Sequence, residues 1–295
     1  MAKLKDNPIT KDDINEYLRE SSDFAFEILV LRRLTSLGFD CEHAGTYADP
    51  ITKKTREFDI RARKCLINEP DLKLNISLSV ECKNLRSNFP LVVHCMPRKE
   101  SERYLDLVWA SKSQTYLPLF ENTMRIPITG DTAPYQKLDP VGKSCDQIGR
   151  KATQDGELIG NDADVFDKIS QAINAAYDLL VEAHYAAEKD LDVVTIVIPV
   201  LIVPNERIWT VWYNLTGGIE REPSIEANVE YYINKSWLID NSSIGYKRRY
   251  YLSHLEIVQI DKIDEMISKY TKMQIVTSPI MLREKMLEHL HHRNK

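Results

Sequence analysis

The sequence lacks an apolar run long enough for a membrane-spanning helix. Its longest apolar stretch covers residues 193–203 and is interrupted by Thr195 and Pro199, whereas a spanning helix needs about 20 apolar residues. The amino-terminal residues also lack the apolar core of a secretory signal peptide. We therefore expect a cytoplasmic protein with no membrane partner.

Cysteine is scarce, and several common catalytic motifs are absent. The five cysteines are odd in number and too widely spaced for a Cys-x-x-Cys zinc site, which fits reduced thiols. No Gly-x-Ser-x-Gly elbow occurs, and no two histidines have the i, i+4 spacing of a zinc-hydrolase helix. Gly142-Lys143-Ser144 is not the end of a phosphate-binding loop, because Lys137 stands where that loop needs its first glycine.

The chain also lacks the positive charge of a protein that coats nucleic acid, since its net charge is −5. Any phosphate contact must therefore come from local clusters. Lys53, Lys54 and Arg56 come just before or at the start of a predicted strand, and Arg61 lies on that strand. Lys143 lies in a later segment that contains several glycines. We expect these residues to contact nucleic acid; the alternative is solvated surface charge.

Two neighbouring segments, residues 57–63 and 74–84, alternate apolar and polar residues as half-buried strands do. Side chains two apart on a strand point to the same face. If the two strands pair, Asp59, Glu81 and Lys83 therefore project from one side of the sheet. The alternative is a solvated or weak cross-strand ion pair.

Two carboxylates and a lysine are the residue types that metal-assisted phosphodiester hydrolysis needs. Magnesium prefers oxygen ligands and usually takes one or two carboxylates, which suits Asp59 and Glu81, and the backbone carbonyl of Cys82 can add a further oxygen. The ammonium of Lys83 can hold the attacking water or neutralise charge on a phosphate oxygen.

The order Asp59, a gap, then Glu81-Cys82-Lys83 resembles the PD-(D/E)xK signature of the restriction-endonuclease-like nuclease superfamily. The resemblance covers about residues 20–96 and, more loosely, 164–213. It implies a helix, a three-stranded meander that carries the signature, then a helix and a further strand. Many relatives carry an acidic metal-binding residue on the first helix, and Glu27 matches it. Phe58 departs from the pattern, because the signature has proline there.

We expect a single α/β domain over residues 1–295, with a restriction-endonuclease-like core and a central mixed β-sheet flanked by helices. The core covers about 20–96 and 164–213, and a long insertion (about 97–163) and a C-terminal extension (about 214–295) elaborate it. Residue patterning gives four further predictions. These are a helix at 99–120, an irregular segment at 123–160, a helix at 164–188, and a strand at 193–203 with 207–213 as its hairpin partner.

The function that follows is Mg²⁺-dependent endonuclease activity, with Mn²⁺ as a substitute. The resemblance implies a nucleic-acid substrate, with DNA favoured over RNA, and a role in restriction, repair or phage defence. A homodimer or a larger assembly would serve double-strand cleavage. The alternative is a noncatalytic nucleic-acid-binding or scaffolding subunit that retains the fold. The presence of Asp59, Glu81 and Lys83 together argues against that alternative.

Overall fold

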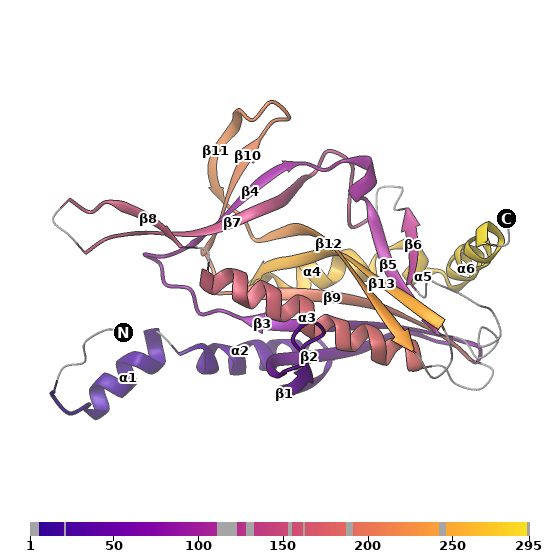
Figure 1. The fold of residues 1–295 in the computed structure, drawn as a ribbon, viewed down its shortest axis with the longest axis horizontal. Helices are drawn as coiled ribbons and strands as arrows, with labels where there is room; N and C mark the ends of the chain where they lie inside the picture. Colours follow the sequence, from indigo (N-terminus) through magenta and orange to yellow (C-terminus); the bar gives the residue numbers. More distant parts are fainter. Residues whose placement is uncertain are drawn as a thin grey trace.

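The computed structural model describes residues 6–20, 22–110, 123–127, 133–152, 155–161, 163–186, 191–241 and 246–293. The chain has an α/β fold in which helices flank one large mixed β-sheet (Figure 1). The helices are α1 (Lys11–Glu20), α2 (Asp23–Ser36), α3 (Ala163–Tyr185), α4 (Ile263–Thr271), α5 (Gln274–Thr277) and α6 (Pro279–Arg293), with short 3₁₀ helices η1 (Glu100–Glu102) and η3 (Ile260–Lys262). No helix among the described residues is long and apolar enough to cross a membrane.

In the described part of the chain, thirteen strands make up the sheet. They are β1 (Asp40–Ala48), β2 (Thr55–Asn68), β3 (Leu72–Cys82), β4 (Leu91–Pro97), β5 (Tyr104–Ala110), β6 (Thr123–Pro127), β7 (Pro140–Arg150), β8 (Leu158–Asn161), β9 (Asp192–Val203), β10 (Ile208–Tyr213), β11 (Ile219–Ile225), β12 (Asn228–Asn241) and β13 (Tyr246–Gln259). Their order is β1-β2-β3-β9-β13-β12-β7-β4-β10-β11, while β5 pairs with β9 and β6, and β8 pairs with β7.

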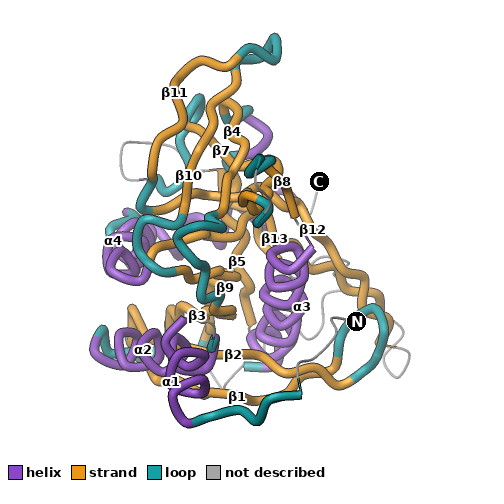
Figure 2. Tube along the Cα trace, turned by 90° about the vertical axis from the view of Figure 1, so that its left-hand side faces the viewer, coloured by secondary structure: helices purple, strands orange, loops and turns teal. Residues whose placement is uncertain are grey.

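Helices cover both faces of the sheet (Figure 2). The apolar side of α3 packs on one face through residues such as Val165, Ile169 and Ala172. On the other face, α2, α4, α5 and α6 share the largest hydrophobic cluster with β2, β3 and β9. Strand β9 is buried on both faces, as predicted for residues 193–203, because its alternate residues belong to clusters on opposite sides of the sheet.

The chain order around the candidate site is a helix, three strands, and later a helix and a strand. Strands β1, β2 and β3 form an antiparallel meander after α2. The amphipathic pattern at 164–188 gives α3, and β9 then pairs parallel to β3. This arrangement places the carboxyl end of β3 between the amino-terminal regions of α2 and α3.

Three predictions from the sequence are wrong. Residues 104–110 form strand β5 rather than a helix, because they pair with the buried strand β9; residues 111–120 lie outside the described residues. The segment 123–160 is not irregular, since it contains β6, β7 and β8. Residues 208–213 pair with β4 and β11, and not with β9, so they are not the hairpin partner of 193–203.

Candidate functional site

Asp59 and Glu81 meet where the paired part of β2 and β3 ends. The ladder between these strands begins at Ile60 and Val80, and the next residues outward are Asp59 and Glu81. The backbone N–H of Cys82 donates to Asp59 Oδ2 at 2.7 Å. The register of two antiparallel strands therefore brings together the two carboxylates that the sequence singled out.

Lys168 of α3 joins the two carboxylates. Its Nζ lies 2.8 Å and 3.2 Å from the two oxygens of Asp59 and 2.9 Å from Glu81 Oε2. Desolvation of the ammonium would lower the pKa of Lys168, but the Glu81 and Asp59 carboxylates outweigh this effect and raise the pKa. The ammonium at this site therefore comes from a helix far along the chain from the motif.

Glu81 is the most buried member of this group, with 1% of its side chain exposed. Burial and the neighbouring Asp59 carboxylate raise the pKa of Glu81, while Lys168 opposes them. Glu81 Oε1 is buried and has no hydrogen-bond partner among the described residues. A buried acceptor of this kind is unusual unless a ligand, water or ion binds it.

Lys83 does not join the carboxylate pair. Its Nζ forms an ion pair with Asp23 Oδ2 at 3.2 Å, at the start of α2. The other oxygen of Asp23 accepts the backbone N–H of Asn84 at 2.8 Å. The alternation of β3 continues only to Cys82, where the strand ends, so the side chain of Lys83 is free to turn toward α2.

Glu27 lies on α2 near Asp59, as predicted, but it is held by another partner. Glu27 Oε2 lies 3.1 Å from His43 Nε2 on β1. Burial and the Asp59 carboxylate raise the pKa of Glu27, and the contact with His43 opposes this shift. Among the described residues no three His, Cys, Asp or Glu side chains are grouped to hold a metal ion. The predicted ligand set of Glu27, Asp59, Glu81 and Cys82 is therefore not assembled as a cage.

The magnesium site can still be tested against the donors that the structure shows. Asp59 and Glu81 already share one cation, the ammonium of Lys168, and Glu81 Oε1 lacks a partner among the described residues. Magnesium usually takes one or two carboxylates and completes its shell with water. The two carboxylates, one of them with an oxygen that has no partner among the described residues, therefore fit magnesium.

Arg61 holds α3 against the sheet, and the prediction that it contacts nucleic acid needs correction. Its guanidinium donates to Asp178 at 2.7 Å and to Glu182 at 3.3 Å, both on α3. The side chain is 6% exposed, which leaves little surface for a phosphate. Ser79 of β3 adds a hydrogen bond to the carbonyl of Ala172. These contacts set the position of α3 and thereby of Lys168.

The other predicted nucleic-acid residues lie in two places. Lys53 and Lys54 are exposed in the β1–β2 turn, and Arg56 is exposed at the start of β2. Asp49 binds the N–H groups of that turn and also accepts a hydrogen bond from Asn174 of α3 at 3.1 Å. Lys143 lies on β7, where it pairs with Glu102 at 2.7 Å. The basic turn is therefore anchored to the helix of Lys168, whereas Lys143 has a partner within the protein.

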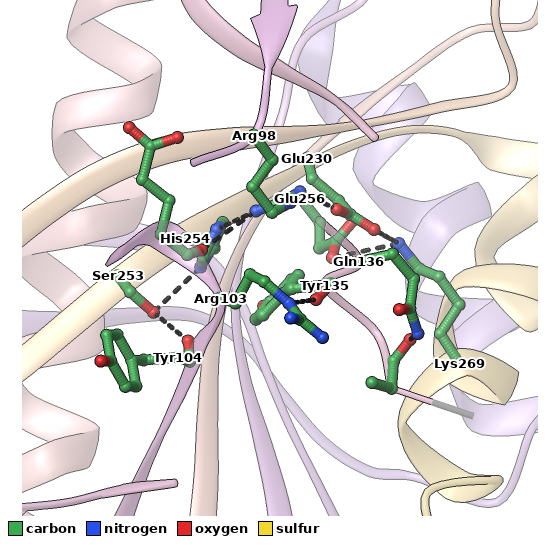
Figure 3. A network of polar contacts seen from close by, with 12 residues as sticks. Arg98, Arg103, Tyr104, Tyr135, Gln136, Glu230, Ser253, His254, Glu256 and Lys269 are labelled. Carbon is green, nitrogen blue, oxygen red and sulfur yellow. Dashed lines mark hydrogen bonds and ion pairs between the residues drawn. The ribbon is translucent and has the colours of Figure 1, made fainter. Parts of the chain in front are cut away.

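A second cluster of buried charges involves β12, β13 and α4 (Figure 3). Arg98, which follows β4 and is almost fully buried, binds Glu230 and His254. Lys269 lies 2.9 Å from Glu230 and 3.0 Å from Glu256. Two cations thus balance two carboxylates, and the contacts link β4 to the strands of the body. We interpret this cluster as structural.

Sequence reasoning missed Lys168 and His43. Lys168 lies in the polar part of an amphipathic helix, where a lysine has no local signal that separates a solvated side chain from a buried one. His43 alternates with its neighbours on an ordinary strand.

Comparison of the chain with protein-family models, with curated proteins and with solved structures finds no match in any of the three.

Proposed function

We propose that this chain is a metal-dependent nuclease that hydrolyses phosphodiester bonds, with DNA favoured over RNA. One observation carries the proposal: the carboxylates of Asp59 and Glu81, from adjacent antiparallel strands, converge on a single ammonium. The order of α2, the β1–β3 meander, α3 and β9 agrees with the core that the PD-(D/E)xK resemblance implies. A restriction-endonuclease-like core is part of the proposal.

Each residue of the site has a distinct proposed role. Asp59 and Glu81, with the carbonyl of Cys82, would hold magnesium, which when bound polarises the phosphate and activates water. Lys168 lies beside both carboxylates and stabilises negative charge that develops on the phosphate oxygens. Glu27 and His43 support the site from α2 and β1. Lys53, Lys54 and Arg56 contact the nucleic-acid backbone from the exposed turn.

The experiment is cleavage of supercoiled plasmid, linear duplex, single-stranded DNA and RNA with magnesium or manganese. Asp59→Asn and Glu81→Gln keep the side-chain shapes and remove the charges, so we expect each to lower the cleavage rate by about 100-fold or more. Glu57→Gln is the matched control, because Glu57 is an exposed carboxylate on the same strand. Equal rates in wild type and Asp59→Asn, or no binding of Ca²⁺ or Mn²⁺ by wild type in calorimetry, would reject the proposal.

One observation favours a second function. Lys168 forms ion pairs with both carboxylates, which is how a scaffolding or noncatalytic nucleic-acid-binding subunit would stabilise a disused site. Such a protein would bind nucleic acid equally well in wild type and Asp59→Asn, and would show no cleavage with either metal.

A further inference from the structure

A small cavity lies beside the carboxylate pair, between the amino-terminal ends of α2 and α3, the loop after β3, and β7. Its volume is about 170 Å³, and its lining includes Asp23, Lys83, Arg86, Phe89, Gln147 and Asp164. Pockets for drug-sized ligands have volumes of about 300–1,000 Å³. The space therefore suits a single flat ring rather than a large molecule.

The cavity adjoins the proposed active site on two sides. Asp164 precedes Lys168 by four residues on α3, so the two lie on the same face of the helix, one turn apart. Lys83 follows Glu81 by two residues and turns away from it to Asp23. A strand whose phosphate reaches Asp59 and Glu81 would therefore place a neighbouring nucleotide at the cavity.

Phe89 is an aromatic side chain held at the cavity instead of in the core. It is partly exposed and belongs to none of the hydrophobic clusters of the described residues. A Cβ atom on Gly149 would come within 2.6 Å of Phe89 Cδ2. The glycine on β7 is therefore what allows the ring to lie there.

Gln147 supplies a buried acceptor at the same place. The residue is 3% exposed, and its Nε2 donates to the carbonyl of Phe89 at 3.1 Å. Its Oε1 is buried and has no hydrogen-bond partner among the described residues. Buried acceptors normally have a hydrogen-bond partner. A hydrogen-bond donor on a ligand would supply that partner for Gln147 Oε1 after a small local shift.

The charges of the cavity balance. Lys83 and Arg86 are matched by Asp23 and Asp164, so the lining carries no net charge that would select a free phosphate. An aromatic ring, a guanidinium plane and an amide acceptor are instead the groups by which proteins bind unpaired bases. We propose that this cavity takes one unpaired nucleobase of the substrate strand, stacked on Phe89. The inference rests on the proposed nuclease function.

This subsite predicts a preference for strands that are not fully paired. A base within a duplex is stacked and paired, and it must leave the stack before it can enter a pocket. Single strands, or duplexes with an unpaired nucleotide near the cleaved bond, would therefore bind more tightly than uninterrupted duplexes.

The test uses the full chain with Ca²⁺ in place of Mg²⁺ and a single-stranded oligonucleotide that contains 2-aminopurine. Phe89→Leu keeps apolar contact with Gly149 and removes the stacking surface, and Phe89→Ala is the second variant. The matched control is Phe166→Ala, because Phe166 is 60% exposed on α3 and does not line the cavity. Anisotropy measures affinity, 2-aminopurine fluorescence measures stacking, and circular dichroism checks folding.

We expect Phe89→Leu to bind the single strand about tenfold more weakly than wild type and to lose the quenching of 2-aminopurine. Affinity for duplex should not change, and Phe166→Ala should resemble wild type. Unchanged binding and quenching in Phe89→Leu, or an equal loss in Phe166→Ala, would overturn the subsite.

The outcome also separates the subsite from the nuclease proposal. If wild type cleaves and Asp59→Asn does not, while Phe89→Leu binds and quenches as wild type does, only the subsite fails. If wild type binds without cleaving and Phe89→Leu loses quenching, the subsite stands and hydrolysis fails. If wild type neither binds nor cleaves any nucleic acid, both are rejected.

Discussion

Lys168 determines, at the scale of single residues, how much negative charge the candidate site presents. Glu81 is almost fully buried and Asp59 is partly buried, and two carboxylates that share one ammonium would repel each other without it. The ammonium of Lys168 therefore stabilises the fold in the absence of metal. A metal ion bound as we propose would share these oxygens with the ammonium, so removal of Lys168 should lower stability and strengthen metal binding.

The first prediction is that Lys168→Met makes the protein less stable without metal and more responsive to it. The variant keeps the length of the side chain but leaves Asp59 and Glu81 without their cation, which should cost about 3 kcal/mol of unfolding free energy. Ca²⁺ should then raise the melting temperature by more in Lys168→Met than in wild type, because no neighbouring ammonium repels the ion. Thermal unfolding with and without Ca²⁺ measures both effects.

Lys83→Met is the control for this experiment, since Lys83 pairs with Asp23 and not with the carboxylate pair. Its response to Ca²⁺ should equal that of wild type. A Ca²⁺ shift in Lys168→Met no larger than that of wild type would mean that Asp59 and Glu81 do not bind the ion.

At the scale of elements, the position of α3 decides whether the site exists. The helix packs on the sheet through small residues such as Ala172 and Ala176, and its polar side is fixed by Arg61. Because Lys168 lies on this helix, a shift of α3 moves the ammonium relative to Asp59 and Glu81. Residues that never touch a substrate can therefore control the geometry of the site.

The second prediction is that Arg61→Ala weakens the docking of α3, whereas Arg63→Ala has little effect. Arg61 is buried and pairs with Asp178 and Glu182, so its loss should cost about 2 kcal/mol, less than a fully buried pair because both acids remain partly exposed. Arg63 is 46% exposed and pairs with the exposed Glu182, and its loss should cost less than about 1 kcal/mol. Urea denaturation of both variants measures the difference, and equal losses would contradict this account of α3.

Particular elements show how far the sequence alone can be interpreted. Alternation of apolar and polar residues predicted strands β2 and β3 and placed Asp59 and Glu81 on one side. Both predictions rest on the two-residue period of side chains along a strand. The same alternation placed Lys83 beside these two carboxylates, which is wrong, because β3 ends at Cys82 and the side chain of Lys83 turns to Asp23. No local pattern predicts the role of Lys168, because its contact with Asp59 on β2 forms only when α3 packs across the sheet.

The strand β5 shows the same limit in the fold. Residues 104–110 are apolar enough to suit either a buried strand or a helix, and periodicity does not separate the two over so short a run. Pairing of Leu107 with Ile196 on β9 settles the choice. The partner lies far along the chain, so the interaction that decides the structure is absent from the local sequence.

At the scale of the whole molecule, residues predicted as an insertion and an extension are part of the central sheet. Strand β7, within the predicted insertion, pairs with β4 and β12. Strand β13, within the predicted C-terminal extension, pairs with β9. Hairpin β10–β11 projects from this sheet together with β7–β8 (Figure 1). The buried charge cluster around Arg98 lies where the projecting strands join the body, so it ties the two parts of the sheet together.

The third prediction concerns this join. Arg98→Met removes the guanidinium that binds Glu230 and His254 and leaves the buried Glu230 with Lys269 as its cation among the described residues. We expect a loss of about 3–5 kcal/mol in unfolding free energy and faster amide hydrogen exchange in β4 and β7, while β3 keeps its protection. Arg33→Met is the control, because Arg33 is 41% exposed and pairs with the exposed Asp264 away from this cluster, so its loss should cost less than about 1 kcal/mol.

Hydrogen exchange distinguishes local opening of the projecting strands from a general loss of stability. If the cluster ties the projecting strands to the body, exchange in Arg98→Met rises first in β4 and β7. The contacts of Asp59 and Glu81 with Lys168 then persist, because β2 and α3 remain docked through Arg61. Uniformly faster exchange, with β3 as affected as β4, would instead mean that the sheet unfolds as one cooperative unit. In that case the candidate site would depend on Arg98 although their side chains do not touch, and mutations in the projecting strands would impair activity through stability alone.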